Sequence, residues 1–221
     1  MNPYGNSAGA IRAISRLAAT AFVIAAVFSW AGNWCDAAII RSNAPSGGRQ
    51  IVCRNIDPEF LGGARVEELT VAEPCREYFI GLTNLASGSL LSNAKAGGWR
   101  YTLMHGTSAI GTAVLNAEQK TGRVLGFNSL QRPGFAQETV EALQKAERLP
   151  QVEKQDYEIR FLNIPAVSFV AIWLHRGSDN ILIPIPPTFG RMNAYQPYAE
   201  AEIIRLLTPH SENTTKSRNS E

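Results

Sequence analysis

The chain has 221 residues, of which 45% are hydrophobic and 18% are charged, and its net charge is +2. This composition is typical of globular proteins and excludes a wholly disordered chain. Lysine and arginine are spread along the sequence without a basic run, so we expect no nucleic-acid partner.

The N-terminal segment has the order of parts found in secretory signals. Arg12 and Arg16 precede an uncharged apolar run over residues 17–31, and small residues that suit a signal peptidase follow. Residues 1–37 are therefore predicted to be a signal peptide or, if they stay uncleaved, a membrane anchor that contacts the bilayer through residues 17–40. In both cases the arginines stay in the cytoplasm and the rest is exported, to the periplasm or the medium.

A short linker and a disulfide are predicted after this segment. Residues 38–50 are rich in Ser, Gly and Pro, which is typical of a flexible linker. Cleavage would remove Cys35 and leave Cys53 and Cys75, which an oxidising compartment would join. Their bridge would close a loop of roughly 20 residues, worth about 3 kcal/mol in the chain-entropy model. Unpaired structural thiols are the alternative.

Residues 51–207 are predicted to form a single α+β domain, in which the part before residue 98 carries weak signals. A helix over residues 76–91 is the clearest element there. Beyond it, alternating apolar residues predict three strands, and apolar residues at helical spacing predict an amphipathic helix. These four elements cover residues 98–104, 109–117, 123–128 and 135–149.

The same order of elements then repeats. Strands are predicted over residues 157–162, 167–175 and 180–185, and a final helix over residues 198–207. The two strand-strand-strand-helix halves suggest an ancient duplication, although ordinary α+β domains show the same order. We expect a largely antiparallel sheet with both amphipathic helices on one face. Residues 208–221 have almost no apolar side chains and are predicted to be a disordered polar tail.

Motifs for common catalytic and cofactor sites are missing from the sequence. The glycines around Ser108 are one residue too far apart for the elbow of a serine hydrolase. The histidines are too widely spaced for a metal motif, and phosphate-binding glycine motifs are missing. We therefore expect a non-enzymatic protein without cofactor or metal. An exported hydrolase that uses Ser108, His105 and His175 is the alternative.

The aromatic and proline-rich stretch before the last helix is the best candidate for binding. Exposed loops of this composition often contact partners, although the stretch could also fold back onto the sheet edge. The side chains expected to bind are Phe189, Arg191, Tyr195 and Tyr198. The favoured function is an exported protein that binds a partner protein or small ligand through this loop or a sheet face. A membrane-anchored assembly or accessory factor is a second alternative.

Overall fold

A computed structural model describes residues 39–61, 64–81, 84, 90–131 and 133–218. The segment predicted to be a signal peptide or anchor, which includes Cys35, lies outside these residues. Within the described ranges, no helix has the length and apolar character needed to cross a membrane. The fold is mixed α+β with a large, mostly antiparallel sheet, which confirms the predicted class.

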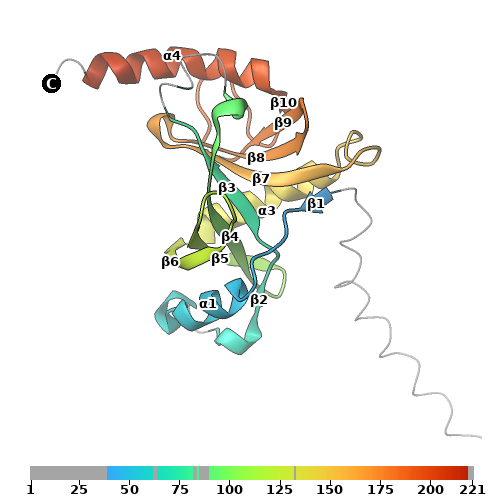
Figure 1. Cartoon of the computed structure of the whole chain (residues 1–221), viewed down its shortest axis with the longest axis vertical. Coiled ribbons are helices and arrows are strands. Elements are labelled where there is room, and N and C mark those ends of the chain that lie inside the picture. The colour runs from blue at the N-terminus through green and yellow to red at the C-terminus, as the bar shows by residue number, and fades with distance from the viewer. Residues whose placement is uncertain (1–38, 62–63, 82–83, 85–89, 132, 219–221) are drawn as a thin grey trace, which may run out of the picture. The chain divides into compact units, whose positions relative to one another are not determined.

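The described part of the chain contains a ten-stranded sheet and three α-helices (Figure 1). The strands are β1 (Ile39–Arg41), β2 (Leu69–Val71), β3 (Cys75–Phe79), β4 (Lys95–His105), β5 (Ser108–Ala117), β6 (Val124–Gln131), β7 (Tyr157–Ile164), β8 (Phe169–Arg176), β9 (Asp179–Pro184) and β10 (Tyr198–Ala199). The helices are α1 (Gly48–Asn55), α3 (Pro133–Glu147) and α4 (Glu200–Arg218).

The centre of the sheet is a parallel pair of strands. The strand order is β10-β9-β8-β7-β3-β4-β5-β6, while β1 also pairs with β7 and β2 with β4. β7 runs parallel to β3 and to β1, and the other neighbours are antiparallel. The chain leaves β3 toward β4 and leaves β7 toward β8, so the two connections diverge from the parallel pair.

Helices α3 and α4 cover opposite faces of the sheet, so the prediction that they share one face is wrong. On β8, Trp173 packs in a cluster with Ile203 of α4, whereas its neighbours Ile172 and Leu174 pack in a cluster with Ala142 of α3. Successive residues of a strand point to opposite faces, which places the two helices on either side of the strand. β8 is thus buried on both faces, as its uninterrupted apolar run indicates.

The linker predicted over residues 38–50 is part of the fold. It contains β1 and the first turn of α1, and α1 packs on β5 and β6. Between these elements, Ser42 donates a hydrogen bond to the carboxylate of Glu158. A Cβ at Gly48 would lie 1.9 Å from the hydroxyl oxygen of Tyr101. Gly48 therefore allows close packing against Tyr101, and glycine at this position does not indicate a flexible linker.

The helix predicted over residues 76–91 is wrong in its first part, which is strand β3. Arg76 and Glu77 are adjacent charges that suggest a solvated helix surface, but both are buried. Arg76 donates hydrogen bonds to backbone carbonyls of the β5–β6 turn, and its guanidinium lies 5.0 Å from the ring centroid of Trp99. Glu77 binds Arg100 on the other face. Each charge has a partner that is distant in the sequence.

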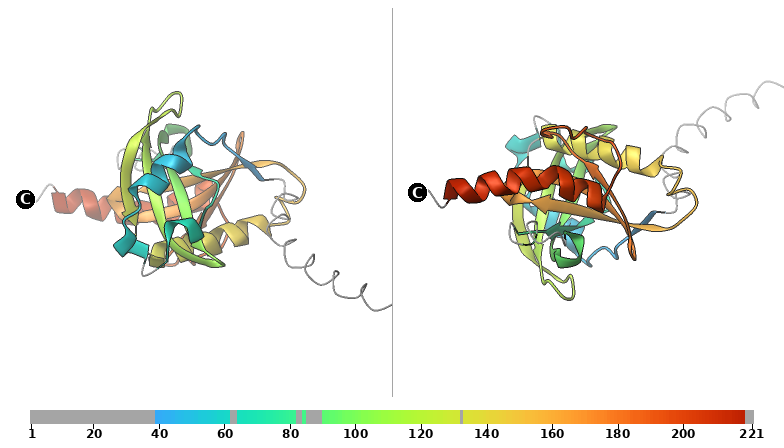
Figure 2. Two further views of the ribbon diagram at one scale, coloured as in Figure 1. Left: turned by 90° about the horizontal axis from the view of Figure 1, so that it is seen from below. Right: turned by 90° about the horizontal axis from the view of Figure 1, so that it is seen from above.

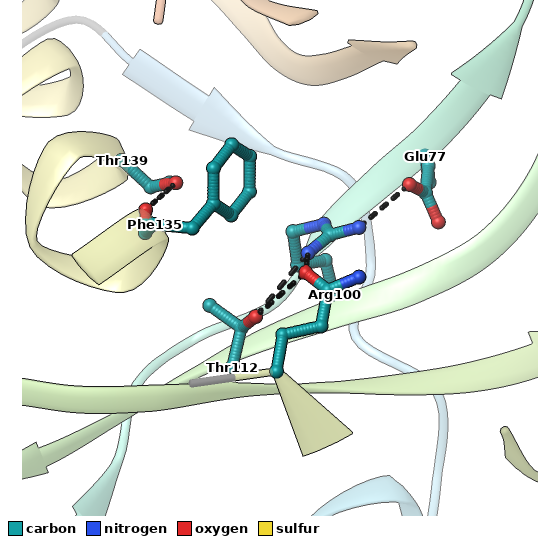
Figure 3. Close-up of polar contacts among 6 residues, drawn as sticks. Glu77, Arg100, Thr112, Phe135 and Thr139 are labelled. Carbon is teal, nitrogen blue, oxygen red and sulfur yellow. Dashed lines mark hydrogen bonds and ion pairs between the residues drawn. The ribbon is translucent and has the colours of Figure 1, made fainter. Parts of the chain in front are cut away.

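Arg100 is the centre of a buried polar network between α3 and the sheet (Figure 3). Its Nη2 donates to Glu77 at 2.8 Å, and its Nη1 donates to Gln131 at 2.5 Å and to Thr112 at 3.2 Å. The guanidinium also lies 4.3 Å from the ring centroid of Phe161. The Arg100 and Glu77 side chains are only 5% and 3% exposed, so each depends on the other for charge compensation.

The polar tail predicted over residues 208–221 is helical as far as Arg218, because α4 continues through Pro209. In Figure 2 the C-terminal end of α4 extends beyond the strands. Ile203 and Leu207, which form an apolar stripe on this helix, are fully buried. The stripe therefore anchors the first half of α4, and the polar sequence that follows extends the same helix.

Arg100→Met should lower the free energy of unfolding by about 3–5 kcal/mol, because it leaves Glu77 as a buried charge without a partner. Urea denaturation followed by circular dichroism measures this loss. Arg123→Met is the matched control, because the Arg123–Glu118 pair is largely exposed and should contribute less than about 1 kcal/mol. Equal losses in the two variants would contradict a special role for the buried pair.

Tyr101→Phe should keep or raise stability by about 1 kcal/mol at neutral pH, because the Tyr101 hydroxyl is buried and has no hydrogen-bond partner among the described residues. Burial raises the pKa of Tyr101 to about 12, above the value near 10 expected for unfolded chains. The native protein should therefore lose stability as the pH rises from about 10 to 12.

Denaturation of the Tyr101→Phe variant at pH 8 and pH 11 tests this expectation, since the variant lacks the titrating hydroxyl. The control is Tyr157→Phe, because the buried Tyr157 hydroxyl donates to Asp179 and its removal should cost about 1 kcal/mol at neutral pH. A comparable loss in Tyr101→Phe at pH 8 would show that its hydroxyl has a partner.

Candidate functional site

A pocket of about 640 Å³ lies at the carboxyl ends of β3 and β7, the central parallel pair. Its volume is in the range of pockets that hold small ligands. Its wall combines the end of β3 and the residues after it, the turn after β7 and the start of β4. The lining residues are Phe79, Ile80, Gly81, Asn84, Lys95, Pro165 and Ala166.

The position of the pocket follows from the sheet topology. Connections that leave adjacent parallel strands in opposite directions open a crevice beyond the strand ends, and ligands of α/β sheets bind at such points. β3 and β7 meet this condition, because their connections lead to β4 on one side and β8 on the other. The Ile80 amide donates to the Asn163 carbonyl at 3.2 Å, so the strands stay joined up to the pocket.

Close packing holds the apolar walls of the pocket in place. Ile80 is 1% exposed and Phe79 is half-buried. A Cβ at Gly97 would lie 2.3 Å from Cε2 of Phe79, so only glycine lets this ring lie against β4. On the opposite wall, Pro165 starts a 3₁₀ turn and its ring fixes the local backbone angle. Both walls are therefore preformed.

Lys95 gives the pocket its charge. It is exposed, it begins β4, and it is paired in register with Phe79 of β3. The described residues that line the pocket include no carboxylate, histidine, cysteine or hydroxyl side chain. Nucleophilic catalysis needs a nucleophile with an adjacent base. The described part of the lining offers apolar surface and one cation.

Arg160 forms a second polar cluster, on the α4 face of the sheet. Its guanidinium lies 4.7 Å and 4.6 Å from the ring centroids of Tyr78 and Trp173, and it donates to Glu158 at 2.9 Å and 2.5 Å. Burial alone would raise the pKa of Glu158, but hydrogen bonds from Arg160 and Ser42 and nearby positive charge lower it. The charges of this cluster compensate each other, so the cluster supports β3 and β7 beside the pocket.

The residues of the hydrolase alternative fall into two groups. Ser108 faces His105 across the β4–β5 turn, and His105 Nε2 lies 3.7 Å from a carboxylate oxygen of Glu68. All three side chains are exposed, at a turn where nothing would exclude water. His175 lies on β8, and β7 and β3 separate it from β4, a distance of about 14 Å at the usual strand spacing.

His175 belongs to a hydrogen-bond network centred on Asn180. The Asn180 side-chain oxygen accepts a hydrogen bond from Trp173 Nε1 at 2.8 Å and lies 2.9 Å from His175 Nδ1. The Asn180 amide nitrogen donates to Glu200 at 3.3 Å, which fixes its orientation. His175 Nδ1 therefore donates its proton to Asn180. This network joins β8, β9 and α4.

The four binding residues expected in the loop before α4 do not converge. Phe189 and Tyr198 pack against the cluster on the α4 face, Tyr195 packs against the cluster on the α3 face, and Arg191 is exposed. The three aromatic side chains thus pack against the core clusters on the two faces of the sheet. Binding through these residues stays a prediction.

Cys53 and Cys75 are free thiols in this structure, and the disulfide between them stays a prediction. Cys53 is exposed on α1, whereas Cys75 is buried on β3. Burial raises the pKa of Cys75, which keeps its thiol protonated and unreactive.

Comparisons with protein families, curated proteins and solved structures found no match to this chain. Among the residues that the structure places, no three His, Cys, Asp or Glu side chains gather in a way that could hold a metal ion. The fold and the site define a mixed α+β protein with a pocket at the carboxyl ends of its central strand pair. Sequence reasoning missed this pocket, because its lining carries no motif.

Proposed function

We propose that this chain is an exported, non-enzymatic α+β protein that binds a small ligand in the pocket beyond β3 and β7. The observation that supports the proposal is a preformed pocket of about 640 Å³ at the point where the connections of the central parallel pair diverge. Pockets with mostly apolar walls and few polar groups are the usual form of a small-molecule site.

The chemistry of the lining favours binding over catalysis. Lys95 has no nucleophilic neighbour among the lining residues. Ser108 and His105, the pair that most resembles a catalytic arrangement, lie at the other end of β4. That strand has 11 residues, which is about 33 Å at the rise of an extended chain. The pocket and that pair therefore belong to different ends of the sheet.

The location of the pocket can be described by the two halves that the sequence suggests. We assign β4, β5, β6 and α3 to the first half and β7, β8, β9 and α4 to the second, with β3 as the strand that joins them. In this arrangement the pocket lies at the junction of the halves. Ligand sites commonly occupy such junctions.

Ala166→Trp should weaken the binding of 1-anilinonaphthalene-8-sulfonate by at least about tenfold in Kd, because the indole would fill the pocket. This fluorescent probe is apolar and anionic, and fluorescence titration measures its affinity. Ala201→Trp is the matched control, because Ala201 is exposed on α4. Equal affinities in the two variants would contradict binding in this pocket, provided that both unfold cooperatively.

The protein recovered from its native cells should begin near Ala38 and lie in the periplasmic or secreted fraction, because residues 1–37 carry the parts of a cleavable signal. Mass spectrometry of the N-terminal peptide checks this expectation. An intact Met1 in the membrane fraction would favour the anchored alternative. Full-length protein in the cytosol would contradict export.

A further inference from the structure

We infer that the ligand of this pocket is an amphipathic anion, with an apolar body between the walls and an acidic group at Lys95. This inference rests on the proposed function, because it assigns a chemical class to the ligand of the same site. Two observations carry it, namely the carbon surface of the walls and the lack of an ion pair for Lys95 among the residues that the structure describes.

The walls of the pocket favour a ligand with an apolar body. Phe79, Ile80, Pro165 and Ala166 contribute hydrocarbon surface, and Gly81 and Asn84 complete the lining beside Lys95. A ligand with many hydroxyl or amide groups would leave them unpaired against these walls, and burying a polar group without a partner is costly. Apolar area removed from water is favourable by about 25 cal/mol per Å².

The connections around the pocket carry a single charge. The sequence from residue 80 to residue 96 contains Lys95 and no other charged residue, and the sequence from residue 161 to residue 174 contains none. This count of charges includes every residue of the two connections. Among the residues of these two connections, the Lys95 ammonium is therefore the only charge.

The nearest carboxylates of the central strands already have partners. Glu77 pairs with Arg100 at 2.8 Å, and Glu158 pairs with Arg160 at 2.5 Å. Among the ion pairs of the described residues, Lys95 has none. An acidic group on the ligand would supply the missing partner and accept a charge-assisted hydrogen bond from the ammonium.

A series of ligands with one chain and three head groups tests the inference. Dodecanoate, dodecanol and dodecyltrimethylammonium, all below their micellar concentrations, compete with the neutral dye Nile red for the full mature chain. We expect dodecanoate to bind about three- to tenfold more tightly than dodecanol, and the cation to bind most weakly. Equal affinity of the three head groups would overturn the inference.

Two substitutions at Lys95 sharpen the test. Lys95→Met keeps the length of the side chain and should remove the preference for dodecanoate, and Lys95→Glu should shift it toward dodecyltrimethylammonium. Lys120→Met is the control, because Lys120 is exposed in the β5–β6 turn and should leave the order unchanged. A preference for dodecanoate that survives Lys95→Met would also overturn the inference.

The outcomes separate this inference from the proposed function. If the three head groups bind equally and Ala166→Trp weakens all of them, the pocket binds ligands but does not select anions. If none of the three displaces the dye and Ala166→Trp has no effect on any probe, both the inference and the proposed function fail.

Discussion

The parallel pairing of β3 with β7 is the constraint on which the rest of the structure depends. In register, Arg76, Glu77, Tyr78 and Phe79 lie beside the run from Arg160 to Asn163. This pairing joins the meander β4–β5–β6 to the meander β7–β8–β9 in one sheet. It also forces their connections apart, and the pocket is the space that results. Without this pair the two meanders would share no strand contact.

Charged side chains set the register of this pair. Glu77 faces Arg100 beneath α3, while Arg76 lies over Trp99 on the other face. A slip of one residue would exchange the two faces and leave a buried carboxylate without its partner. Removing a charge from water without a partner is costly, so a slipped sheet would be much less stable than the native one. The charged residues of this central strand therefore fix its register.

The sequence predicts the regular second part of the domain well, because periodicity is local. The apolar alternation before His105 and the uninterrupted apolar run before Arg176 both lie on strands, as predicted. A helix is predicted in place of β3 because the partners of its charged residues are remote in the sequence. Pairing between distant segments also decides which face of the sheet each helix covers, and it forms the pocket between Phe79 and Pro165. Periodicity carries no information about such pairing.

The long interval between β3 and β7 also affects how the chain folds. β7 follows β3 only after two hairpin strands, a further strand and helix α3 have been made. The central contact of the sheet is therefore of high sequence separation, and such contacts form slowly because the intervening chain must first be closed into a loop. Until β7 has been made, the chain therefore lacks the strand contact that joins its two meanders into one sheet.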